Sequence, residues 1–235
     1  MLKFYEKNQI MFAVLWIVAY CMIIAPIRGT YGDGSIQMLL GLIVFSLGLT
    51  LFVKGNRLEN RFGLDRWPEN MKKLLYLVPM WILSTGNIWD GFAPSFKGIA
   101  LVYALLSMFL VGYVEEMIFR GFLFKGMMNE GRTIIAILVS AITFGMGHIV
   151  NLFTGQAGFE TIIQIIFAIS WGFILTMVYY KGGSILPCIL AHSIIDMCSV
   201  VGKDSLLVDW IYIIATVIVA IIYCIYLSRI HTEKE

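Results

Sequence analysis

Eight apolar runs, separated mostly by glycines, prolines and charged residues, take up most of the 235 residues of this chain. A helix needs about 20 mainly apolar residues to cross the hydrocarbon core of a bilayer, which is ~30 Å thick. The sequence therefore predicts an all-α integral membrane protein with about eight transmembrane helices. The runs cover residues 10–26, 36–53, 74–89, 98–124, 133–150, 161–180, 184–201 and 208–227.

The composition agrees with this class of protein. Hydrophobic residues make up 60% of the chain and charged residues 14%, whereas a soluble domain is about half apolar and about a quarter charged. No internal repeat or linker divides the sequence, so we expect a single multi-span domain over residues 1–235, surrounded by the lipid bilayer. The net charge of +2 and the lack of a basic tract exclude a nucleic-acid partner.

The positive charges predict the orientation of the chain. With eight spans, thirteen of the 17 Lys and Arg residues fall on one side of the membrane, three fall on the other side, and Arg120 lies within a span. Loops rich in Lys and Arg stay on the cytoplasmic side, so we expect both termini to be cytoplasmic in a plasma-membrane protein. The run 74–89 is the weakest span: it is short and contains Pro79, so it crosses, kinks or fails to cross fully.

Charged and histidine side chains inside the apolar runs form three groups. A charged side chain in hydrocarbon costs at least about 2.5–3.5 kcal/mol, so such residues usually face a bundle interior or a wet cavity and have a function. One convergent site explains the three groups more simply than three unrelated structural contacts do. The groups are Glu115, Glu116 and Arg120; His148; and His192 with Asp196.

The first group contains two carboxylates that are adjacent in sequence but point in different directions on a helix. At about 100° per residue, Glu116 and Arg120 lie on the same side of a helix and can pair. Glu115 points about 100° away from Glu116 and has no counter-charge in its own helix. Glu116 is therefore expected to be structural, whereas Glu115 suits a general base that activates water. The alternative is a buried ion network of all three residues that only fixes helix packing.

The histidines are ambiguous when they are taken singly. Gly145 and Gly147 permit a close helix approach or a local bend that brings His148 against a neighbour. His192 and Asp196 are four residues apart, so they share one face of a helix. They either bind a metal or stabilise a developing charge, or they form a self-contained hydrogen bond.

The depth of the groups predicts the side on which the site opens. Counted at 1.5 Å per residue from the cytoplasmic end of each span, the first and third groups lie roughly 12–14 Å deep. We therefore expect the site to open toward the cytoplasm.

Together, the motifs Glu-Glu-x-x-x-Arg, Phe-x-x-x-His and His-x-x-x-Asp, in this order on multi-span helices, resemble one known family. It is the CPBP family of CAAX proteases and bacteriocin-processing enzymes, also called Abi, which includes the Ras-converting CAAX endopeptidase. The motifs cover roughly residues 111–200 of a motif-bearing core at about 98–201. The resemblance implies an intramembrane endopeptidase with a peptide or protein substrate at or in the membrane.

The resemblance also implies roles for the first two motifs. Glu115 would be the general base, His148 would help to hold it, and Glu116 with Arg120 would be the supporting pair. The family is often called a metalloprotease, and Glu115, His148 and His192 can be zinc ligands. In that case Glu116 or a water network would supply the base. A metal-free glutamate mechanism is equally compatible with the sequence.

For the third motif, the resemblance places His192 and Asp196 on the oxyanion side of the scissile carbonyl. An ionised aspartate only accepts hydrogen bonds. This role therefore requires a protonated Asp196, donation by His192 alone, or an Asp196 that only orients His192.

Two other classes of function use the same buried charges. One is a transporter or proton relay, in which Glu, His and Asp inside the helices form the pathway. The other is a non-catalytic scaffold or immunity factor that keeps the fold and binds a peptide. A variant of Glu115 tests these alternatives: an enzyme loses its activity, whereas a scaffold keeps its phenotype.

Overall fold

The computed structural model describes residues 1–68, 77–154 and 157–229. In these residues the chain is almost entirely helical and forms no strand beyond an isolated bridge between Phe92 and Gly202. In chain order the helices are α1 (Leu2–Lys7), α2 (Gln9–Tyr31), α3 (Ile36–Gly55), α4 (Glu59–Phe62), α5 (Val78–Ser84), η2 (Gly86–Ile88), α6 (Ile99–Glu116), η3 (Met117–Phe124), α7 (Lys125–Met128), α8 (Thr133–Met146), η4 (Gly147–Thr154), α9 (Gly158–Gly182), α10 (Leu186–Val201) and α11 (Leu206–Arg229).

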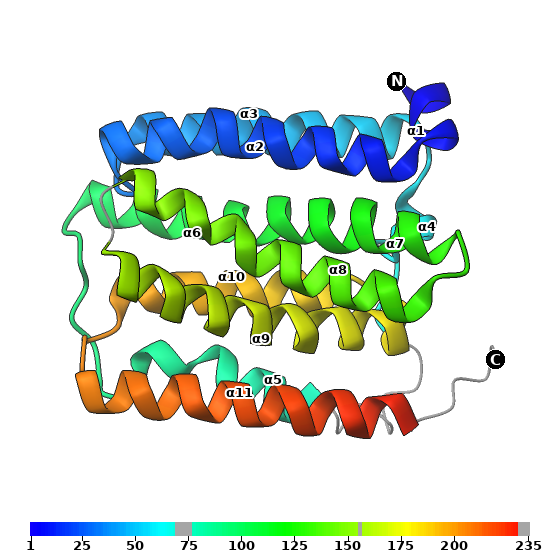
Figure 1. Cartoon of the computed structure of the whole chain (residues 1–235). Coiled ribbons are helices and arrows are strands. Elements are labelled where there is room, and N and C mark those ends of the chain that lie inside the picture. Colours follow the sequence, from blue (N-terminus) through cyan, green and yellow to red (C-terminus); the bar gives the residue numbers. More distant parts are fainter. Residues whose placement is uncertain (69–76, 155–156, 230–235) are drawn as a thin grey trace.

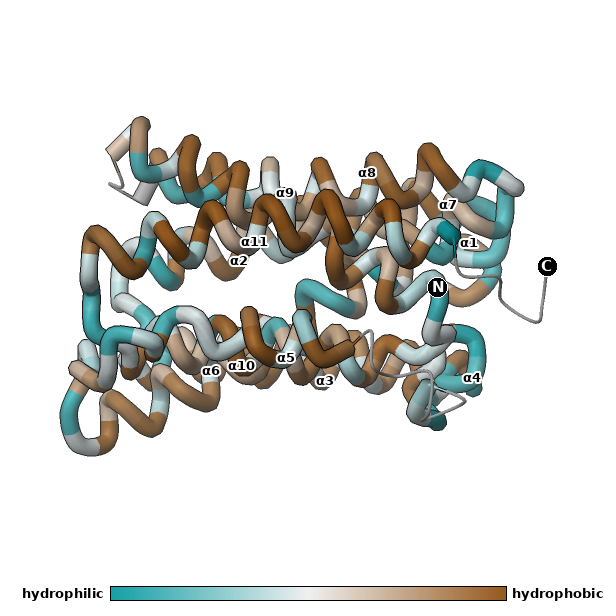
Figure 2. The backbone as a smooth tube through the Cα atoms, turned by 90° about the horizontal axis from the view of Figure 1, so that it is seen from below, coloured by the Kyte–Doolittle hydropathy of each residue, from teal (hydrophilic) through white to brown (hydrophobic). Residues whose placement is uncertain are grey.

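The long helices lie side by side in one bundle (Figure 1). Helices α2 and α3 form one side, α11 and α5 form the opposite side, and α6, α8, α9 and α10 lie between them. Figure 2 shows that hydrophobic residues predominate along the middle of the helices, whereas hydrophilic residues gather at the two ends of the bundle. This pattern is expected when the middle of the bundle lies in hydrocarbon and both ends in water.

The structure confirms an all-α membrane protein, but not the number of eight spans. Six helices in the described part of the chain are long and apolar enough to cross a membrane. Helix α10 has only 16 residues, about 24 Å at 1.5 Å per residue. Helix α5 has seven residues, and residues 74–76 of the predicted third span lie outside the described residues. The six helices are Gln9–Tyr31, Ile36–Gly55, Ile99–Met128, Thr133–Leu152, Gly158–Gly182 and Leu206–Arg229.

The predicted end of the first span at residue 26 is wrong. Helix α2 continues through Pro26 to Tyr31 and ends at Gly32, which has a positive φ of 73°. Membrane helices tolerate an internal proline, because neighbouring groups satisfy the backbone carbonyl that the proline leaves free. The extra turn keeps Arg28 on the helix.

Most basic residues gather at one end of the bundle. The N-terminus and the end of α11 lie at this same end (Figure 1). Among the described residues, the elements at this end, namely α1, α4, α7 and the last turns of α3, α9 and α11, carry Lys3, Lys7, Lys54, Arg61, Lys125, Lys181 and Arg229, whereas the last turn of α2 at the other end carries Arg28. The asymmetry agrees with the predicted topology, while a cytoplasmic location of this end stays a prediction.

Small residues bring α6 against α10. A Cβ atom on Gly112 would lie 2.6 Å from the backbone nitrogen of Ser193 and 2.9 Å from its Cα. The Ser193 hydroxyl donates to the carbonyl of Phe109 over 3.0 Å, which ties the two helices together. Because His192 precedes Ser193 and Glu116 lies one turn after Gly112, this contact sets the distance between the two predicted motifs.

A second close contact joins α8 to α9. A Cβ atom on Gly145 would lie 2.8 Å from the backbone nitrogen of Ile169, and one on Gly172 would lie 2.7 Å from the carbonyl oxygen of Ala141. The predicted close approach at Gly145 is thus confirmed. Gly147 has another role, because α8 ends beside it and the 3₁₀ segment η4 begins there.

We predict that Gly112→Val destabilises the protein. Overpacking a tight contact costs roughly 1–3 kcal/mol, and here the valine side chain meets the backbone of Ser193 rather than a flexible side chain. The control is Gly55→Val, because a Cβ atom at Gly55 meets nothing within 4 Å. Thermal unfolding of the purified proteins in detergent measures the difference, and equal midpoints for the two variants would contradict this account of the α6–α10 contact.

Candidate active site

Glu116 and Arg120 form an ion pair in the middle of the bundle. The Arg120 Nη1 donates to Glu116 Oε1 over 2.8 Å, and both side chains are completely buried. The Arg120 Nη2 donates to the carbonyl of Gly172 over 3.3 Å, and its guanidinium carbon lies 4.3 Å from the ring centroid of Phe144. The predicted pairing is confirmed, and the arginine also binds α8 and α9.

The helix changes type directly after Glu116. Residues Met117–Phe124 form the π-helical segment η3, which continues α6 without a break. Such segments are rare and occur frequently at functional sites. The run of apolar residues gave no signal for this change, so the sequence predicted only a regular helix over 98–124.

His192 links the third motif to the first. Its Nδ1 donates to Glu116 Oε1 over 2.9 Å, and its Nε2 lies 3.5 Å from Asp196 Oδ2 and 3.8 Å from Glu115 Oε2. One imidazole therefore faces three carboxylates from α6 and α10. The structure brings these two motifs together, although the sequence had not paired His192 with Glu116.

Glu115 has a different environment from Glu116. Its side chain is 15% exposed, against 0% for Glu116, and its Oε1 accepts a hydrogen bond from the Tyr20 hydroxyl over 2.9 Å. Glu115 lines a cavity of about 60 Å³, which has room for about two water molecules at ~30 Å³ each. The lining residues are Tyr20, Cys21, Ile24, Ala25, Arg28, Glu115, Phe119, Phe144, Gly147, His148, Val150 and Asn151.

His148 lines the same cavity from η4. Its Nδ1 has no hydrogen-bond partner among the described residues, and its ring contacts Phe144 edge-on at 5.8 Å between centroids. Phe144 also contacts the ring of His192 at 5.3 Å. The ring of Phe144 therefore lies between the two histidines. A direct contact of His148 with Glu115 stays a prediction.

Sequence reasoning missed the contribution of α2 to this cavity. Nothing in the sequence indicated that Tyr20 belongs to the site, because a tyrosine within an apolar run is common. Only the packing of α2 places its hydroxyl beside Glu115. Arg28 lies at the far end of the lining and pairs with Asp33, at 2.8 Å between Nε and Oδ1. Arg28 is in the last turn of α2, and α2 ends at the end of the bundle opposite to the N-terminus (Figure 1). The predicted opening toward the cytoplasm finds no support in this cavity and stays a prediction.

The family comparison points to the same segment of the chain. Residues 97–198 match the model of a family described as Type II CAAX prenyl endopeptidase Rce1-like. The resemblance to the CAAX proteases is confirmed. No curated protein matches the chain. The Rce1-like segment contains all six predicted site residues, whereas Tyr20 and the rest of α2 lie outside it.

The Rce1-like match implies a protease with a peptide or protein substrate in a membrane environment. It does not extend to the bacteriocin-processing enzymes, and that part of the resemblance stays a prediction. Across residues 1–68, 77–154 and 157–229, no three His, Cys, Asp or Glu side chains are grouped to hold a metal ion. Zinc binding by Glu115, His148 and His192 stays a prediction.

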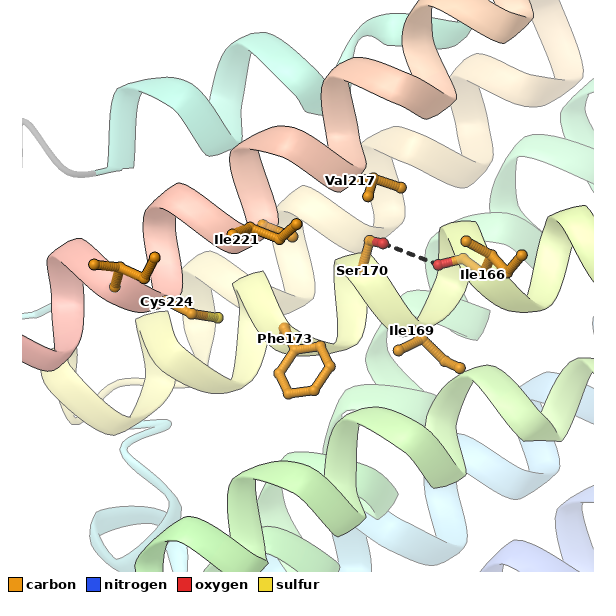
Figure 3. Close-up of a pocket in the computed structure, with 9 residues that line it drawn as sticks. Ile166, Ile169, Ser170, Phe173, Val217, Ile221 and Cys224 are labelled. Carbon is orange, nitrogen blue, oxygen red and sulfur yellow. Dashed lines mark hydrogen bonds between the residues drawn. The ribbon is translucent and has the colours of Figure 1, made fainter.

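A larger groove lies away from this cluster, between α9 and α11 (Figure 3). Its volume is about 520 Å³ and its lining is almost entirely apolar. The hydroxyl of Ser170 donates to the carbonyl of Ile166 in its own helix over 2.9 Å, as the dashed line in Figure 3 marks. Cys224 supplies the one ionisable side chain in this lining, so the groove offers no acid–base pair for catalysis.

We predict that Arg120→Met strongly destabilises the protein. Removing one partner of a buried ion pair leaves an uncompensated charge, at a cost of roughly 3–5 kcal/mol, and Glu116 is completely buried. The matched control is Arg132→Met, because Arg132 is 63% exposed and lies 4.0 Å from Glu130. Such surface pairs contribute about 0–1 kcal/mol. Denaturant unfolding of both variants measures the difference, and equal stability would show that Arg120 does not neutralise Glu116.

Proposed function

We propose that this protein is an intramembrane endopeptidase of the CAAX type, in which Glu115 activates water for attack on a peptide bond. One observation carries the proposal. Of two adjacent glutamates, Glu116 is bound by Arg120 and His192, whereas Glu115 lines a cavity of about 60 Å³. The ion-pair partner of Glu115, the His192 Nε2, is 3.8 Å away, against 2.8 and 2.9 Å for the two partners of Glu116. A carboxylate that lines a cavity and is not committed to a close ion pair suits a general base.

The proposed reaction needs no covalent intermediate. Glu115 takes a proton from a water molecule in the cavity, and the water oxygen bonds to the carbonyl carbon of the scissile peptide. Glu115 then gives this proton to the peptide nitrogen, the C–N bond breaks, and a carboxylate and an amine leave. Cys21 also lines the cavity. Among the described residues, no hydrogen bond joins its thiol to a base, and a thiol nucleophile needs such activation.

The other predicted residues support this chemistry in our proposal. Glu116, Arg120 and His192 fix α6, α9 and α10 around the cavity through hydrogen bonds of 2.8–3.3 Å. Asp196 orients His192 from the next turn of α10. His148 lines the cavity wall, where its ring can hold the water or Glu115. We place the protein in the plasma membrane with a substrate at or in the bilayer.

We predict that Glu115→Gln abolishes proteolysis. General base catalysis contributes roughly 10²–10⁴-fold, and glutamine cannot take up the proton. The measurement compares protein N-termini in membranes of cells that express the wild type or the variant at equal levels. New termini that disappear in the variant identify both the substrate and the cleavage site.

A matched control accompanies this comparison. Glu160→Gln changes an exposed glutamate in the first turn of α9 and is expected to keep the new termini. Identical termini in the wild type and Glu115→Gln would refute the catalytic role. A scaffold or immunity factor, or a transporter or proton relay, would then be the better account.

We propose that the reaction is independent of zinc, because the described side chains are not grouped to hold a metal ion. Cleavage of a peptide that spans the identified site is measured with the purified protein before and after dialysis against a chelator. The rate is expected to stay within about twofold, which corresponds to about 0.4 kcal/mol. A loss of activity that added zinc restores would instead assign a metal to Glu115, His148 and His192.

A further inference from the structure

The proposed reaction creates a negative charge on the carbonyl oxygen, and an enzyme stabilises it with hydrogen-bond donors aimed at the place where it develops. His192 and Asp196 are poorly placed for this task. Neither residue lines the cavity beside Glu115. His192 donates from Nδ1 to Glu116, and its Nε2 faces the carboxylates of Asp196 and Glu115 at 3.5 and 3.8 Å. An ionised Asp196 accepts but does not donate.

The donors that do line the cavity are few. Arg28 contacts both carboxylate oxygens of Asp33, at 2.8 and 3.0 Å. Asn151 donates from Nδ2 to Gln164 over 2.8 Å. His148 lies at the wall but makes no described contact with Glu115. Tyr20 is the donor within hydrogen-bond distance of the proposed base, at 2.9 Å.

The position of the Tyr20 hydroxyl is fixed by its surroundings. The ring packs edge-on against Phe45 of α3, with 5.5 Å between the centroids, and α2 packs against both α3 and η3. The hydroxyl is therefore preorganised, so that little reorganisation is needed when charge develops.

We propose that Tyr20 is the oxyanion donor of this protein, in place of a donor at position 196; this inference rests on the proposed function. Before the reaction the Tyr20 hydroxyl donates to Glu115 Oε1. When Glu115 takes the proton from water, its oxygen becomes a weaker acceptor, and the hydroxyl donates to the carbonyl oxygen that gains negative charge. The phenol keeps its proton throughout. When the C–N bond breaks, the oxyanion returns to a carbonyl and the hydroxyl returns to Glu115.

The test is the kinetics of Tyr20→Phe with the purified protein and a peptide that spans the identified cleavage site. Removal of one oxyanion donor lowers kcat by about 10²–10³-fold, and KM is expected to change little, because the bond strengthens only in the transition state. The control is Tyr113→Phe. The Tyr113 hydroxyl also has a single side-chain partner, Thr50 Oγ1 at 2.8 Å, but does not line the cavity.

A second substitution at the same position separates loss of the donor from loss of the fold. Tyr20→para-aminophenylalanine keeps an N–H donor where the hydroxyl lies and is expected to have a kcat between those of the wild type and Tyr20→Phe. A kcat as low as that of Tyr20→Phe would overturn the proposal. This variant also decides the question if thermal unfolding shows that Tyr20→Phe does not fold.

The Glu115→Gln variant keeps this inference distinct from the proposed function. If Glu115→Gln is inactive and Tyr20→Phe keeps the wild-type kcat, the oxyanion donor is not Tyr20, but the proposed function stands. If Tyr20→Phe changes KM alone, Tyr20 binds substrate, and the inference is again wrong. If Glu115→Gln keeps its activity, the proposed function fails, and with it the inference.

Discussion

The buried pair of Glu116 and Arg120 is the interaction on which the rest of the site depends. Both side chains are completely removed from solvent, in a region where an uncompensated charge costs several kcal/mol. The pair is stable because each partner has further bonds: Arg120 reaches the carbonyl of Gly172 and the face of Phe144, and Glu116 accepts from His192. These bonds join α6 with η3 to α8, α9 and α10.

This network gives two neighbouring glutamates different chemistry. Glu116 is committed to the network, so it is held in place and cannot reach the cavity. Glu115, one residue earlier, points elsewhere on the same helix and meets Tyr20 and the space beside His148. A catalytic carboxylate and a structural carboxylate can therefore be adjacent in sequence, because the helix turns about 100° between them.

The Rce1-like segment at 97–198 contains the network, but not the whole cavity. Helix α2 supplies Tyr20, Cys21 and Arg28 from outside this segment. The part of the chain without a recognised motif thus forms one wall of the candidate site. This arrangement places residues that can select a substrate or assist the reaction on an element that the motifs do not identify.

The sequence by itself determined the membrane class, the bounds of most long helices and the pairing of Glu116 with Arg120, because hydropathy and helical period are local properties. It also identified the six ionisable residues of the candidate site, because ionisable side chains within apolar runs are rare and can be read directly from the sequence. Only the tertiary structure decided that His192 binds Glu116, that a π-helical turn follows Glu116 and that Tyr20 bonds to Glu115. Those contacts join residues 76 and 95 positions apart. They depend on close helix packing at small residues such as Gly112, which no local pattern specifies.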